Sequence, residues 1–204
     1  MHPSGLWGHD RRVGNRWGNE GPPPEAYSRV TDPGKYAALH EIAYDVVAEF
    51  EHRYDVVRAD TTELSDRAPD GITRPVAVLT LTPPDPGASA VAVVMDPFPG
   101  LIVRSGRSRQ VHVPSCGCDA CDETVEDCTA QLREHLTDIA EYGFSERLVF
   151  EDGYWWQEGR QPGPGGESWG RGRLSGEQVP RQRALIPEGG YTCLPWTQRT
   201  NDPS

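Results

Sequence analysis

Residues 75–113 read PVAVLTLTPPDPGASAVAVVMDPFPGLIVRSGRSRQVHV, and this segment holds four short runs rich in Val, Ile, Leu and Thr. The four runs are residues 75–82, 90–95, 101–104 and 109–113, and a fifth run precedes them at 54–59. Such runs, separated by Gly, Pro, Asp and Ser, are typical of strands. Because short links of this composition form turns between neighbouring strands, we predict an antiparallel meander.

Two amphipathic helices are expected on either side of the meander. Apolar residues recur three and four apart over residues 33–52 and again over 122–142, a spacing that puts them on one helix face. Asp32 and Pro33 suit the start of the first helix, and Gly143 suits the end of the second. The sequence therefore predicts an α+β fold in which two helices pack on one face of a mostly antiparallel sheet of five to seven strands.

The remaining segments suggest how the chain is divided. Residues 147–150 and 154–157 flank Glu151-Asp152-Gly153, which is a strong hairpin signal. We predict a disordered leader at 1–26, an α+β domain at 27–160, and a Gly/Pro-rich, partly ordered tail at 161–204.

Charge and composition exclude several classes of function. The formal net charge is −11, which repels nucleic acids and anionic membrane surfaces. An apolar run long enough to span a membrane is missing, as is an apolar signal-peptide core. We therefore expect a cytoplasmic protein without nucleic-acid or membrane partners. The Gly-rich stretch also contains five arginines, and we interpret it as a solvated loop or as a local basic patch. The five are Arg160, Arg171, Arg173, Arg181 and Arg183.

Concentrated chemistry is found where the last predicted strand meets the second helix. Cys116, Cys118 and Cys121 form a C-x-C-x-x-C pattern that offers three thiolate ligands to a soft metal. Surrounding carboxylates oppose a free thiolate, whereas a divalent cation tolerates both groups, so zinc is the sharpest hypothesis. The fourth ligand would be His112, a carboxylate or Cys193. We predict His112, although its alternation with two valines places it on the outward face of its strand.

Two other interpretations of these cysteines remain open. The cluster is also consistent with a plain thiol-rich turn that binds nothing. Alternatively, Cys118 and Cys121 form a C-x-x-C redox pair at a helix start, with Cys118 as the attacking thiolate. Cys128 lies on the apolar stripe of the second helix and is interpreted as a small buried side chain.

Three segments resemble a known family. They are Pro114-Ser115-Cys116-Gly117-Cys118-Asp119-Ala120-Cys121-Asp122-Glu123, Phe98-Pro99-Gly100-Leu101 and Ala26-Tyr27-Ser28-Arg29-Val30-Thr31. Together they resemble an uncharacterised family of actinobacterial proteins of unknown function. The resemblance implies membership over about residues 27–154, without an activity or a cofactor.

The functional expectation follows from the cysteine cluster and from missing motifs. The sequence lacks a nucleophile elbow, a Walker loop, a dinucleotide fingerprint and an H-E-x-x-H helix, so no catalytic residue is predicted. The leading hypothesis is a non-enzymatic interaction or regulatory module, in which the cysteine segment, with or without zinc, stiffens a surface for a protein partner. The alternative is a thiol oxidoreductase or redox sensor that uses Cys118 and Cys121.

Overall fold

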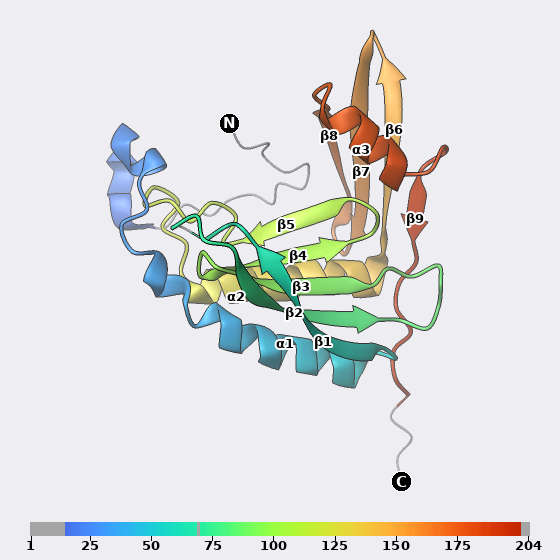
Figure 1. Cartoon of the computed structure of the whole chain (residues 1–204), viewed down its shortest axis with the longest axis horizontal. Helices are drawn as coiled ribbons and strands as arrows, with labels where there is room; N and C mark the ends of the chain where they lie inside the picture. The colour runs from blue at the N-terminus through green and yellow to red at the C-terminus, as the bar shows by residue number, and fades with distance from the viewer. Residues whose placement is uncertain (1–14, 69, 201–204) are drawn as a thin grey trace.

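The computed structural model describes residues 15–68 and 70–200, and it contains two antiparallel sheets (Figure 1). Residues 1–14 of the predicted leader lie outside the described residues. The elements, in chain order, are the 3-10 turns η1 (Asn15–Glu20), η2 (Pro24–Ser28) and η3 (Pro33–Tyr36), α1 (Leu39–Arg53), β1 (Val57–Ser65), β2 (Arg74–Thr82), β3 (Val91–Asp96), β4 (Gly100–Ser105), β5 (Arg109–Val113), α2 (Val125–Thr137), the π-helical turn η4 (Asp138–Tyr142), β6 (Phe144–Glu151), β7 (Tyr154–Gly163), β8 (Gly166–Arg173), α3 (Gln178–Leu185) and β9 (Tyr191–Cys193).

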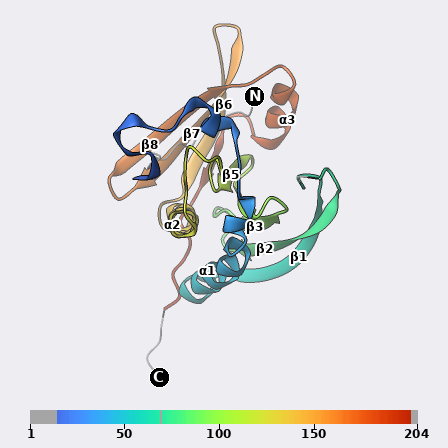
Figure 2. The same ribbon diagram turned by 90° about the vertical axis from the view of Figure 1, so that its left-hand side faces the viewer.

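The first sheet is the predicted meander, with strand order β1-β2-β3-β4-β5. Strand residues alternate between its two faces, so one face receives Leu79, Val93 and Val103, which join the main core. The helices α1 and α2 cover that same face (Figure 2), and the fully buried Val46 and Leu132 represent them in the core. The α+β class, the antiparallel pairing and the placement of both helices on one face are therefore confirmed.

The opposite face of the first sheet is concave, and side chains from several of its strands contact one another across it. Val78, Val94 and Ile102 form a second buried cluster there. Arg104 of β4 reaches Glu63 of β1 at 2.8 Å, although two strands lie between them. Such an ion pair requires the sheet to coil strongly, which is the usual right-handed twist of a meander taken further. Figure 2 shows the β1–β2 end of the sheet curving toward the side opposite α1 and α2.

The second sheet has strand order β8-β7-β6-β9, and its first strand follows η4. Gly143 ends the helical segment at φ 64°, as predicted from its position. The predicted hairpin joins β6 to β7 through Asp152 and Gly153, both at positive φ, which a two-residue primed turn requires. After β9, the buried Trp196 donates from Nε1 to Ser89 O at 2.9 Å and so connects this sheet to the first one.

Three local boundaries differ from the sequence predictions. The first α-helix starts at Leu39, because residues 33–36 form a 3-10 turn that buries Tyr36, and the Asp32 side chain caps nothing. β1 runs over 57–65 and not 54–59, because Tyr54 is fully buried in the core and makes a bridge to Gln198. The Gly-rich residues 166–173 form β8, since pairing with β7 supplies the order that their composition does not.

β7 continues across residue 160, where the domain was predicted to end. The division into a leader, a domain and a tail stays a prediction. No helix within residues 15–68 and 70–200 has the length and apolar character needed to span a membrane.

Candidate metal centre

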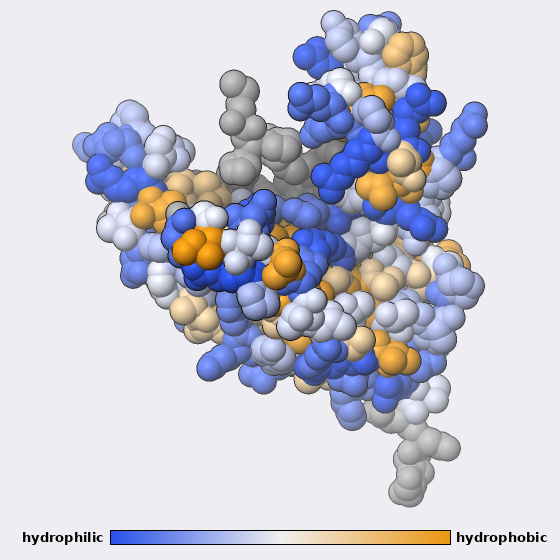
Figure 3. All heavy atoms as spheres, in the orientation of Figure 1, coloured by the Kyte–Doolittle hydropathy of each residue, from blue (hydrophilic) through white to orange (hydrophobic). Residues whose placement is uncertain are grey.

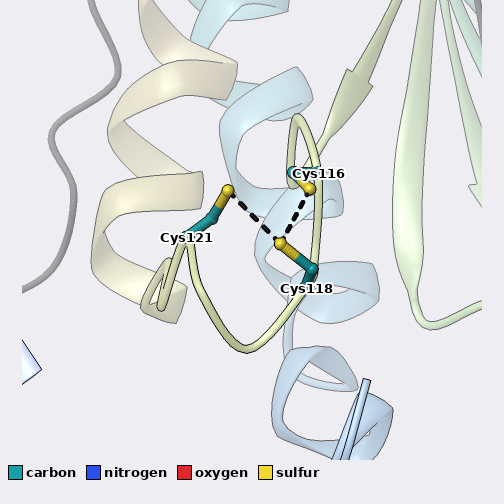
Figure 4. A group of neighbouring side chains, drawn as sticks. All are labelled: Cys116, Cys118 and Cys121. Atoms are coloured by element: carbon teal, nitrogen blue, oxygen red, sulfur yellow. Dashed lines mark hydrogen bonds between the residues drawn. The ribbon is translucent and has the colours of Figure 1, made fainter. Parts of the chain in front are cut away.

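The cysteine loop, residues 114–123, connects β5 to α2 and gathers three thiols at one point (Figure 4). Cys116 Sγ lies 3.1 Å from Cys118 Sγ, and Cys118 Sγ lies 3.5 Å from Cys121 Sγ. The ligand atoms of all three residues lie within 4.8 Å of one another. Two thiolates bound to one tetrahedral zinc at about 2.3 Å would be about 3.8 Å apart. The sulfur atoms are therefore close to the spacing that a shared metal ion requires.

A single buried carboxylate holds the loop in this shape. Glu123 is 7% exposed and its side chain turns back toward the strand end. Its oxygens accept hydrogen bonds from the backbone N–H groups of Ser115 at 3.2 Å, Cys116 at 3.2 Å and Gly117 at 3.4 Å. Gln131 of α2 adds a fourth bond, from Nε2, at 2.9 Å. The carboxylate thus ties the first half of the loop to the helix that follows.

The charge on Glu123 is stabilised by these partners. Burial alone would raise the pKa of the Glu123 carboxyl, but the hydrogen bonds from Gln131 and from three backbone N–H groups outweigh burial, so its pKa is lowered. Glu123 is one of the carboxylates around the cysteines, which the sequence analysis expected to oppose a free thiolate. In the structure, the backbone donors and Gln131 hydrogen-bond to the carboxylate, and these bonds reduce its repulsion of a thiolate in the loop.

The helix start fixes where Glu123 sits. Thr124 Oγ1 accepts from the Asp127 backbone N–H at 3.1 Å, and the Asp127 carboxylate accepts from the Thr124 N–H at 3.2 Å. This capping box begins α2 at Val125, three residues later than predicted. The T-x-x-D spacing was visible in the sequence and would have placed Glu123 just before the cap.

The N-terminal segment lies across the other half of the loop. The backbone N–H groups of Asp119 and Ala120 donate to Arg29 O at 2.8 Å and to Ala26 O at 3.1 Å. The Asp119 carboxylate accepts from both N and Oγ1 of Thr31, at 2.9 and 2.5 Å. Ala26 also packs with Cys118 and Ala120 in a small buried cluster that Trp17 and Cys121 contact. Residues 26–31 therefore form a strap over the loop, which sequence reasoning did not predict.

The third segment of the resemblance meets the same loop. Gly117 has φ 74°, and a Cβ on it would lie 3.2 Å from the ring of Phe98. A side chain at 117 would thus be strained by its backbone and crowded by an aromatic ring. The segments at 26–31, 98–101 and 114–123, which are far apart in the chain, are in contact in the fold.

The three thiols are not equivalent. Burial raises the pKa of Cys116, and it raises the pKa of Cys121 to about 12. Burial acts in the same direction on Cys118, but hydrogen bonds from Cys116 and from the Cys121 backbone N–H outweigh it and lower the pKa of Cys118. Cys118 is therefore the thiol of the three that deprotonates most readily.

The other predicted residues lie elsewhere. His112 belongs to β5, opposite Ile102, where its Nε2 is 3.2 Å from the Gln110 side-chain nitrogen, and it is outside the three-cysteine group. Cys193 lies on β9, and its Sγ accepts from the Ser89 N–H at 3.1 Å. Cys128 is fully buried in the core, as predicted. The structure therefore brings together Cys116, Cys118 and Cys121 but not His112 or Cys193.

The arrangement defines an α+β protein of two antiparallel sheets whose chemistry is concentrated in a three-cysteine loop at one end of the first sheet. A family model described as "Family of unknown function (DUF6226)" matches residues 8–200. The chain therefore belongs to this family, which agrees with the membership in an uncharacterised family that the three segments indicated. No curated protein matches the chain. No solved structure matches it either.

Proposed function

We propose that Cys116, Cys118 and Cys121 bind a zinc ion, and that the cysteine loop is a stiffened surface for a protein partner. The observation that carries the proposal is the convergence of three Sγ atoms within 4.8 Å on a loop that Glu123 already holds in place. Thiolates are the soft ligands that zinc prefers, and bound zinc deprotonates thiols whose pKa is otherwise raised. The metal thereby removes the cost of placing three sulfur atoms together.

A fourth ligand completes the proposed site from outside the sulfur group. Cys116 is exposed, so the fourth tetrahedral position is open to water or to a side chain of a partner. His112 remains the sequence-based candidate, and it would have to leave its contact with Gln110 to take this role. A partner ligand would couple metal binding to association, which suits an interaction module better than a catalyst.

Elemental analysis of protein purified without a histidine tag tests the metal. We expect about one zinc per chain, and we expect Cys116→Ser, which changes an exposed residue, to lose most of it. Cys128→Ala is the matched control, because it removes a cysteine that lies outside the group. Stoichiometric zinc that persists in Cys116→Ser and Cys118→Ser would contradict the proposal. Cobalt substitution adds a visible-absorption readout of thiolate ligation in both variants.

The lowered pKa of Cys118 favours a second candidate function, that of a thiol redox sensor. In this function the Cys118 thiolate attacks a peroxide, which gives a sulfenic acid and releases hydroxide. The thiol of Cys121, 3.5 Å away, then displaces water and forms a disulfide. A reversible mass loss of two hydrogens in metal-free protein, absent in Cys121→Ser, supports the sensor. Thiols that react only after a chelator is added support the metal.

Two finer features of the family belong to the same proposal. We expect the P-S-C-G-C-D-A-C-D-E motif to be the shared signature of the family, and its members to be actinobacterial. The contact of the three segments around the loop supports the first expectation. We also place the protein in the cytoplasm, because its five cysteines are free thiols. A partner captured by wild-type protein and lost with Cys116→Ser would support the interaction role.

A further inference from the structure

A pocket of about 670 Å³, lined by both polar and apolar residues, lies between the concave face of the first sheet and α3. The β4–β5 hairpin forms one wall, and α3, from the chain segment after the second sheet, forms another. Figure 1 shows α3 near the hairpin end of β4 and β5, and Figure 2 shows it on the side of the sheet opposite α1 and α2. This end of β5 is about 15 Å from the cysteine loop at the rise of an extended strand. The pocket is therefore separate from the candidate metal centre.

The pocket is lined by more basic than acidic side chains, whereas the whole chain is acidic. The whole chain carries −11, and Figure 3 shows mainly hydrophilic residues on this face. The ionisable residues that line the pocket are Glu63, Arg104, Arg107, Arg109 and Arg181. Arg104 is paired with Glu63, and the Arg109 guanidinium contacts Gln161 and Phe144 of the second sheet, so a positive potential that would concentrate small anions in the pocket rests on Arg107 and Arg181.

These arginines differ in whether their guanidinium groups already have partners within the protein. Arg104 is paired with Glu63 at 2.8 Å. Arg109 is buried, with its guanidinium bonded to Gln161 and stacked over Phe144. It therefore acts as a fixed part of the wall.

Arg107 and Arg181 are the two arginines available to a ligand. Arg107 is exposed, and its guanidinium lies over the Tyr191 ring, 5.0 Å from the centroid, which orients the group without neutralising it. Arg181 is exposed on α3 and makes no ion pair within residues 15–68 and 70–200. Two exposed guanidinium groups, one from each wall, therefore line the same pocket.

The pocket also contains an unsatisfied acceptor. Gln182, next to Arg181, has a buried Oε1 without a hydrogen-bond partner in the described part of the chain. A buried acceptor left unpaired is destabilising, so a ligand with a hydroxyl group that reached it would be favoured. The volume falls in the range of about 300–1,000 Å³ that is typical of small-molecule sites.

We propose that this pocket binds a small organic phosphate that also carries hydroxyl groups. Arg107 and Arg181 would pair with the phosphate oxygens, for which the planar guanidinium fork is suited. Gln182, which also lines the pocket, would turn its amide to hydrogen-bond a hydroxyl of the same ligand. A nucleic-acid strand is a poorer occupant, because the acidic surface outside the pocket repels a long polyanion.

Ribose 5-phosphate and inorganic phosphate are the probes for calorimetric titration of the full chain at constant ionic strength. We expect saturable binding of both, tighter for the sugar phosphate, and none for ribose. Arg107→Gln and Arg181→Gln should each weaken ribose 5-phosphate by about tenfold or more, which corresponds to the loss of one charge-assisted hydrogen bond. Circular dichroism of these surface variants verifies that they are folded.

Arg133→Gln is the matched control, since Arg133 is an exposed arginine on α2 that pairs with Glu49 and is absent from the pocket lining. It should leave the affinity unchanged, as should Cys116→Ser. The proposal is overturned by no saturable binding of either phosphate, by equal weakening in Arg133→Gln, or by citrate binding more tightly than ribose 5-phosphate. The last result would assign the pocket to carboxylates instead.

Discussion

The carboxylate of Glu123 offers the sharpest test of how the cysteine loop is held. Glu123→Gln preserves the size of the side chain but replaces one acceptor oxygen by an NH₂ group. One oxygen now accepts from the N–H groups of Cys116 and Gly117, and the other accepts from Ser115 and Gln131. In the variant, one of these two sets of donors faces another donor.

The cost follows from the number of donors that lose a partner. Each buried N–H left unpaired costs about 1–3 kcal/mol, and two are affected on the side of Cys116 and Gly117. Because Cys116 is exposed, water relieves part of this cost, so we expect a loss of about 3 kcal/mol in the free energy of unfolding. For a chain of this size, that loss lowers the Tm by about 6–12 °C.

The pH dependence gives an independent measure of the same carboxylate. The folded pKa of Glu123 lies below its ordinary value of 4.5, so its stabilisation is complete above about pH 4.5 and is lost as the pH falls through the folded pKa. Glu123→Gln should therefore unfold at lower urea concentration than wild type at pH 7, with the difference shrinking at pH 3. Urea titration at both pH values measures this.

Glu126→Gln is the control, because Glu126 is an exposed carboxylate in the first turn of the same helix. We expect it to change the free energy of unfolding by at most about 0.5 kcal/mol. If Glu123→Gln behaves like Glu126→Gln at pH 7, or if its deficit does not shrink at low pH, the role assigned to this carboxylate is wrong.

Three further predictions concern the contacts of Gly143 and Trp196, and the cysteine loop. Gly143→Ala should cost about 3 kcal/mol or more in urea unfolding, because a Cβ there would lie 2.1 Å from Cys193 O at a positive φ; a change below about 1 kcal/mol would contradict this. Trp196→Ala should cost about 3–5 kcal/mol by the same assay, through the loss of a buried ring and of the Nε1 bond to Ser89 O; a wild-type midpoint would refute it. Removal of zinc by a chelator should leave the far-UV circular dichroism unchanged; collapse of the spectrum would contradict the loop geometry described above.

Most of the first sheet was predictable because its residues carry strong local signals. The runs at 75–82 and 90–95 fall within one residue of β2 and β3, since alternation and β-branching specify a strand that is buried on at least one face. The Asp152-Gly153 turn was equally predictable, because few other dipeptides adopt two positive φ angles in succession.

The second sheet was less predictable because its order comes from distant partners. β8 is rich in Gly and polar residues, and it is a strand because β7 offers it a full register from Trp156 to Gly163. β9 is three residues long and pairs with β6, which lies more than forty positions earlier in the chain. Neither pairing leaves a period in the local sequence, so composition alone suggested a tail.

The candidate site shows the same contrast on a smaller scale. Three cysteines within six positions at a strand end were sufficient to predict that their sulfur atoms converge, because a short loop cannot separate them far. The roles of Glu123 and of the strap at 26–31 depend on contacts with groups that the sequence does not mark as partners. Every residue has a backbone carbonyl, so no sequence motif predicts that the carbonyl of Ala26 accepts a hydrogen bond from the Ala120 N–H.

The way in which the loop is held bears on what the sulfur cluster is for. A loop that needs zinc in order to fold would have few hydrogen bonds of its own, as in small zinc domains. Here the protein supplies many hydrogen bonds of its own, because Glu123 fixes one half and the bonds to Arg29 and Ala26 fix the other. The protein has therefore already met the conformational cost of bringing the thiols together, and metal binding would be largely a matter of exchanging protons for a cation. A preorganised site of this kind can gain or lose its ion while the fold persists, which is the property that an interaction surface controlled by metal supply or by thiol oxidation requires.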